Sequence, residues 1–138
     1  EEKRTATEPI SYTLDHVQFS GGDQDIATAT VRLIGPDQKS ATDASTGNGP
    51  VDAVCNAIDR VIGCECELVD FKVQAVTEGM DSMGSVTIRI ESAGKTYTGR
   101  GADTDIIVAS GKAYLSAVNR MLAADEESNI PAVGTTPD

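Results

Sequence analysis

Hydrophobic and polar residues alternate along the first part of the chain, which is the pattern of half-buried β-strands. The alternation runs over residues 12–19 and 26–34, and in the second segment the odd-numbered positions from 27 to 33 are all apolar. A glycine-rich turn at 21–23 joins the two segments. The turn Gly35-Pro36-Asp37 then leads to a third, shorter strand over 39–45. These features predict three consecutive antiparallel strands.

A helix is predicted directly after the third strand. Asn48-Gly49-Pro50 combines cap-type residues with proline at the start of the helix, and Gly63 supplies the stop. Asp52 in the first turn and Arg60 in the last turn both favour the helix dipole. The apolar residues fall on a single stripe at helical spacing, namely Val51, Val54, Cys55, Ile58, Val61 and Ile62.

The same pattern then occurs a second time, about 56 residues later, as in an internal repeat. Strands are predicted over 66–77, 85–91 and 95–101, and a helix from about 105 to 122. Residues 77–84 are expected to form a long loop flanked by glycines. With this shift Lys39 falls on Lys95, Thr42 on Thr98, Ala53 on Ala109 and Ala57 on Ala113.

The repeat predicts an α+β fold of two pseudo-symmetric βββα units, over about 12–63 and 64–122, packed as a two-layer domain. Each unit is too small to cover a stable core alone, so each needs the other. We expect the helices to share one layer and the strands to lie in another, with a crevice where the units meet. Residues 1–11 are expected to be a linker, and 123–138 a tail.

Composition narrows the possible partners and the compartment. A formal charge of -11 on 138 residues repels phosphate backbones and anionic membranes, and no apolar run is long enough to span a bilayer. Neither nucleic acid nor a membrane is therefore an expected partner. Three cysteines form an odd set that suits a reducing cytoplasm, and the missing initiator Met indicates a piece of a longer chain.

The candidate chemistry is sparse. The segment 47–50 opens the first helix with small residues, so it could bind an anion such as a carboxylate through free N–H groups, or serve only as a sharp turn. Cys64 and Cys66 are spaced too closely for the usual zinc pairs, so we expect no metal site. The single histidine, His16, has no nucleophile or base at a recognisable spacing, so we expect no catalytic residue and no cofactor.

Four motifs occur in an order that resembles the C-terminal regulatory domain of 2-isopropylmalate synthases and their citramalate synthase relatives. They are Thr46-Gly47-Asn48-Gly49-Pro50-Val51-Asp52-Ala53, Ala75-Val76-Thr77-Glu78-Gly79-Met80-Asp81, Gly99-Arg100-Gly101 before Asp105-Ile106-Ile107, and Ala113-Tyr114 before Ala117-Val118-Asn119. The resemblance covers about 12–122. It implies a homodimerising domain that binds leucine and thereby inhibits leucine biosynthesis.

The resemblance also implies an effector site and a parent enzyme. The polar end of the amino acid would meet Gly47, Asn48, Gly49, Pro50, Val51 and Asp52, and its aliphatic end Leu68, Phe71, Ala75 and Ile106, with Thr77 and Ser82 near the closing loop. The parent would be an acyltransferase that uses acetyl-CoA and 2-oxoisovalerate on a separate N-terminal TIM barrel holding a divalent metal. Two alternatives stay open: an isoleucine-binding citramalate synthase domain, and a dimerisation module without an effector.

Overall fold

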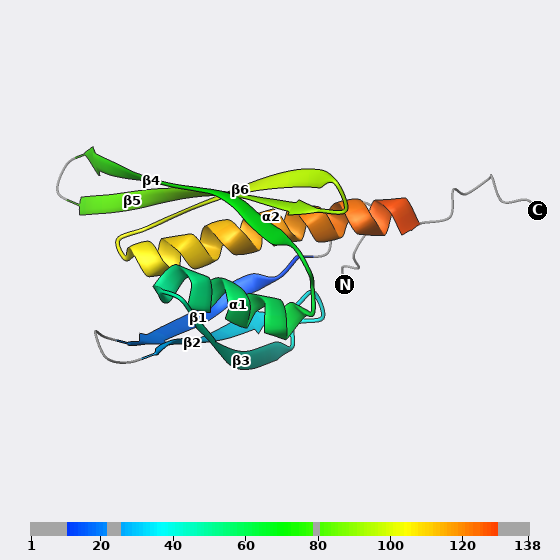
Figure 1. Ribbon diagram of the computed structural model, residues 1–138, viewed down its shortest axis with the longest axis horizontal. Coiled ribbons are helices and arrows are strands. Elements are labelled where there is room, and N and C mark those ends of the chain that lie inside the picture. The colour runs from blue at the N-terminus through cyan, green and yellow to red at the C-terminus, as the bar shows by residue number, and fades with distance from the viewer. Residues whose placement is uncertain (1–10, 22–25, 79–80, 130–138) are drawn as a thin grey trace, which may run out of the picture.

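The computed structural model describes residues 11–21, 26–78 and 81–129, with only the backbone described for 75–78, 81–82 and 126–129. Six strands and two helices follow in the predicted order, as two βββα units (Figure 1). The first unit contains β1 (Thr13–Ser20), β2 (Ala27–Ile34), β3 (Ser40–Gly47) and α1 (Pro50–Ile62). The second contains β4 (Glu67–Glu78), β5 (Asp81–Ser92), β6 (Lys95–Asp103) and α2 (Ile106–Asn129). The predicted α+β fold class is confirmed.

The two units repeat each other in detail. Each sheet is antiparallel with its strands in chain order, β1-β2-β3 and β4-β5-β6. Each first strand carries an irregularity at the equivalent place, between Leu14 and His16 in β1 and between Leu68 and Asp70 in β4. Even an exposed ion pair recurs, with Arg32–Asp15 at 3.2 Å and Arg89–Asp70 at 3.3 Å. The internal repeat seen in the sequence is therefore a structural repeat.

The core comes from the central strands and from one stripe on each helix. The alternation predicted for β2 is confirmed, since Ala29, Val31 and Leu33 are buried, and β5 buries Val86, Ile88 and Ile90 in the same way. On α1, Val54, Cys55 and Ile58 of the predicted stripe are buried, and Val51, Val61 and Ile62 are partly buried. Full burial of one such aliphatic side chain contributes about 1.5–3 kcal/mol.

The two helices share one layer, as expected, and the two sheets lie on its opposite sides (Figure 1). Helix α1 packs on β2 and β3, helix α2 packs on β5 and β6, and the helices contact each other. The packing of α2 on β6 is especially close, because a Cβ added to Gly99 would overlap the backbone of Ala113 and Ala117. Only glycine permits this spacing.

Two segments differ from the sequence prediction. Strand β5 begins at Asp81 rather than at 85, so most of the expected loop over 77–84 belongs to a hairpin in which Thr77 pairs with Ser82 and Glu78 with Asp81. The backbone groups there gain ladder hydrogen bonds that an open loop would leave to water. Helix α2 continues to Asn129, beyond the expected end at 122. None of the helices in the described ranges has the length and apolarity needed to cross a bilayer.

Candidate functional site

A hollow of about 530 Å³ lies between α1 and the start of β4, where the first unit meets the second. This volume falls within the range of small-molecule sites. Its lining comes from α1 (Val51, Asp52, Cys55, Asn56 and Asp59), from the start of the second unit (Cys66, Glu67, Leu68 and Phe71) and from α2 (Tyr114). The hollow thus combines carboxylates and an amide with several apolar side chains.

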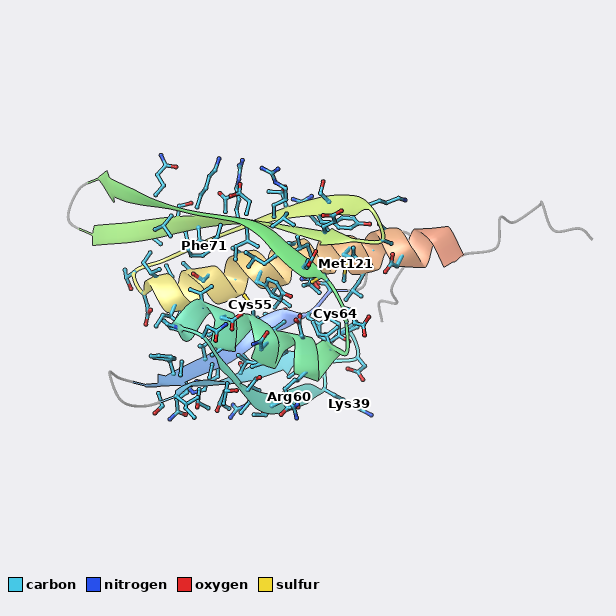
Figure 2. All side chains as sticks on the ribbon, in the orientation of Figure 1. Lys39, Cys55, Arg60, Cys64, Phe71 and Met121 are labelled. Atoms are coloured by element: carbon cyan, nitrogen blue, oxygen red, sulfur yellow. The ribbon has the colours of Figure 1, made fainter. Side chains whose placement is uncertain are left out.

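The apolar side of the hollow depends on the irregularity in β4. Leu68 pairs with Ile90 and Phe71 with Ile88, and both partners belong to the buried face of the sheet. Without the extra residue between them, positions 68 and 71 would point to opposite faces. Figure 2 shows Phe71 on the side of its sheet that faces the helices. Leu68 remains 42% and Phe71 37% exposed, so both are available to a ligand.

The polar side of the hollow is the first turn of α1. Its N-cap is Gly49, which makes no side-chain capping bond. The equivalent residue in the second unit, Asp105, accepts a hydrogen bond from the Ile107 N–H at 2.8 Å through its side chain. The first turn of α1 therefore keeps N–H groups that no N-cap side chain satisfies, in a position that favours a carboxylate.

Asp52 is held at this helix start by its own hydrogen bonds. Its Oδ2 accepts the Asn48 N–H at 2.8 Å and the Asn56 amide at 3.4 Å. These contacts fix a carboxylate beside the uncapped turn, where it could pair with an ammonium group. Gly47 has a steric role, because a Cβ there would overlap the backbone of Ala53 where β3 approaches α1.

The structure brings together four of the predicted site residues and separates others. Val51, Asp52, Leu68 and Phe71 line the one hollow. Gly47, Asn48 and Gly49 directly precede α1 and Pro50 begins it, and none of these four residues is part of the lining. Ile106 begins α2 and packs against Gly84 of β5, apart from the hollow. The backbone of Ala75 and Thr77 belongs to β4 and that of Ser82 to β5, and their side chains lie outside the described residues.

Asp59, Cys66 and Tyr114 line the hollow but were not singled out from the sequence as site residues. The Tyr114 hydroxyl donates a hydrogen bond to Asp59 Oδ1 at 2.6 Å and lies 3.0 Å from Cys66 Sγ. Burial raises the pKa of Asp59, and the hydrogen bonds from Tyr114 and Cys64 offset this only in part. One feature of the sequence could have pointed to this network, namely a tyrosine on the apolar face of the second predicted helix. A buried tyrosine hydroxyl needs a hydrogen-bond partner.

This network predicts a pH dependence of stability. The pKa of Asp59 is higher in the folded protein than in the unfolded chain. Protonated Asp59 therefore contributes fully to the free energy of unfolding at low pH, and this contribution is lost as pH rises through the raised pKa. The variant Asp59→Asn resembles the protonated form, so its free energy of unfolding should decline less over that window. Urea unfolding at a series of pH values in EDTA measures this. The exposed Asp125→Asn serves as the control, and equal slopes in the two variants would contradict the expectation.

A second hollow of about 500 Å³ lies between β1 and α2, in the place that the repeat makes equivalent. There the Tyr12 backbone is fastened to α2, since its N–H donates to Asn119 Oδ1 at 2.8 Å and its carbonyl accepts from Asn119 Nδ2 at 3.0 Å. The corresponding residue after α1 is Gly63, which has no side chain to fasten β4. The first turn of α2 does not line the second hollow, and the Asp105 side chain already caps that turn. The hollow at α1 is therefore the better candidate for an amino acid.

Duplicated βββα units around a shared helix layer, with an open hollow at their boundary, define a class of α+β domain with internal pseudo-symmetry. The chain belongs to the LeuA allosteric (dimerisation) domain family, whose model matches residues 1–122. This confirms the resemblance drawn from the four motifs.

Several relatives share this region at high identity. The chain is 53% identical over 113 residues to a 2-isopropylmalate synthase of Gloeobacter violaceus, covering 82% of this chain and 21% of that protein. It is 52% identical over 118 residues to the Microcystis aeruginosa protein of the same name, covering 86% and 22%. A Ruminiclostridium cellulolyticum protein, also named 2-isopropylmalate synthase, is 43% identical over 122 residues, covering 88% and 24%. The chain therefore spans about a fifth to a quarter of the length of these relatives.

Proposed function

We propose that the chain is the regulatory domain of a 2-isopropylmalate synthase and that free leucine binds in the hollow between α1 and β4. The observation that carries this proposal is the pairing, in one hollow, of an uncapped helix start with an apolar wall. Val51 and Asp52 lie at the uncapped helix start, and Leu68 and Phe71 form the apolar wall. Family membership and the names of the relatives supply the context.

Each part of leucine has a matching surface in this hollow. The carboxylate would accept hydrogen bonds from the first-turn N–H groups of α1, where the helix dipole also favours negative charge. The ammonium group would pair with Asp52, which the hydrogen bonds from Asn48 and Asn56 already orient. The isobutyl group would contact Leu68 and Phe71. Isoleucine differs only in branching, so discrimination between the two amounts to about 1–3 kcal/mol.

Dimerisation would allow the bound amino acid to regulate the parent enzyme. An apolar surface on the helix-facing side of β4, made of Leu68, Phe71 and Val73, is 37–49% exposed and adjoins the hollow. We infer that a second copy covers this surface. Leucine would then bias the dimer through its different affinity for two arrangements.

The parent activity is part of the same proposal. The remaining length of the relatives would contain the TIM barrel that condenses acetyl-CoA with 2-oxoisovalerate at a divalent metal, and this chain would contribute no catalytic group. We propose a cytoplasmic location on the same basis. A citramalate synthase domain that answers to isoleucine is the alternative, and the relative affinities for the two amino acids decide between them.

Isothermal titration calorimetry of the 138-residue chain with leucine, isoleucine and valine tests the proposal. We expect the tightest binding for leucine. Phe71→Ala should weaken it by about tenfold or more, because the truncation removes an apolar contact of at least about 1.5 kcal/mol. Lys72→Ala is the matched control, because its side chain is on the opposite face of β4. If none of the three amino acids gives binding heat, the effector role is refuted. The alternative of a dimerisation module without an effector would then stand.

A further inference from the structure

Three potential metal ligands meet where α1 ends and the second unit begins. The Asp59 carboxylate and the sulfur atoms of Cys64 and Cys66 offer ligand atoms that all lie within 4.8 Å of one another. The Cys64 thiol donates a hydrogen bond to Asp59 Oδ1 at 3.5 Å. All three residues are partly buried, and Asp59 and Cys66 also line the hollow at α1.

The local fold explains this convergence. Gly63 ends α1 in the left-handed conformation with a φ of 79°, and its N–H bonds to the Asp59 carbonyl. The chain therefore reverses over the last helical turn, and the next residues return to the side chain of Asp59. Tyr114 approaches from α2, and its hydrogen bond at 2.6 Å holds the carboxylate beside the sulfur atoms. The cluster joins parts of both units.

The donor set is one that thiophilic cations prefer. Zinc binds sulfur at about 2.3 Å and carboxylate oxygen at about 2.0–2.2 Å, so the ligands of one ion lie about 3–4 Å apart. The observed spread is close enough that small side-chain rotations suffice. Two sulfur ligands favour Zn²⁺ or Cd²⁺ over Mg²⁺ and Ca²⁺, which prefer oxygen.

We propose that Asp59, Cys64 and Cys66 bind a thiophilic divalent cation such as Zn²⁺, with the fourth coordination position open to the hollow at α1. As each metal–sulfur bond forms, the thiol proton passes to solvent, so one bound ion releases about two protons. This inference is independent of amino-acid binding.

Titration of the reduced, metal-free chain with Cd²⁺ tests the site, because thiolate ligation produces a charge-transfer band in the ultraviolet. We expect one ion per chain, displaced by Zn²⁺ and not by Mg²⁺. Cys64→Ser and Cys66→Ser should each abolish the band, and Asp59→Asn should weaken binding by about tenfold or more. Cys55→Ala is the matched control, because this buried thiol lies outside the cluster and its loss should leave the band intact.

Alkylation of the unmodified chain gives a second result that needs no variant. Equimolar Zn²⁺ should protect Cys64 and Cys66 from iodoacetamide, as read by peptide mass spectrometry. A wild-type chain that shows no Cd²⁺ band while folded by circular dichroism, or a band that persists in both serine variants, would overturn the proposal. Equal alkylation with and without Zn²⁺ would do the same. Because no amino acid is present, none of these failures bears on the effector proposal.

Discussion

Gly99→Ala is expected to destabilise the domain by about 3 kcal/mol, a large part of the 5–15 kcal/mol that holds most domains together. The reason is steric. The new Cβ would overlap the Ala113 carbonyl and the Ala117 amide, which belong to the backbone of α2 and cannot rotate away. Relief therefore requires β6 and α2 to separate, and this contact anchors the second sheet to the helix layer.

Urea unfolding measures the effect, and Gly49→Ala is the matched control. An added Cβ at Gly49 meets nothing within 4 Å, and the residue is in an extended conformation with a φ of -172°. Its cost is limited to a poorer helix cap, about 1 kcal/mol or less. All variants are compared at one protein concentration, because a dimer couples stability to concentration. Similar unfolding midpoints for the two variants would show that the close approach of β6 and α2 is absent in solution.

Val73→Lys is expected to convert the proposed dimer into a monomer. Val73 is 49% exposed, pairs with the buried Val86 and therefore belongs to the helix-facing side of β4, next to Phe71. A lysine ammonium placed in an apolar interface loses its hydration without gaining a partner, at a cost of about 3 kcal/mol. Dimer affinity should fall by about a hundredfold.

Multi-angle light scattering over a concentration series measures this change. Gln74→Lys is the control, since it adds the same charge at the neighbouring position on the opposite face of the strand. We expect the wild type and Gln74→Lys to remain dimers at concentrations where Val73→Lys is monomeric. Dimers of all three proteins would place the interface elsewhere, and monomers of all three would remove dimerisation from the proposed function.

The two units diverge where a functional asymmetry is needed. Asp105 caps α2 and Asn119 fastens β1 to that helix, whereas Gly49 leaves α1 uncapped and Gly63 cannot fasten β4. The pseudo-symmetric fold thus has one boundary with a capped helix, at α2, and one with an uncapped helix, at α1. The boundary at α1 contains both the proposed effector hollow and the proposed metal cluster, so any coupling between two ligands would act through Asp59 and Cys66.

The sequence alone determined the elements and their repetition. Alternation in β2 and the helical stripe from Val51 to Ile62 report local burial, which depends on residues two to four positions apart. Those periods can be read from the sequence alone, as can the end of the first helix at Gly63. The four motifs then identified the family, and the resemblance implied a common site for Val51, Asp52, Leu68 and Phe71. The structure brings these four residues to one hollow.

Tertiary structure alone decided which distant groups complete the hollow. Tyr114 meets Asp59 and Cys66 across 55 and 48 residues, a contact that depends on how the helices pack and not on any local period. For the same reason the spacing of Cys64 and Cys66 argued against a metal site, while the fold added Asp59 beside them. Sequence periodicity encodes which face of an element is buried, and only packing fixes which element covers it.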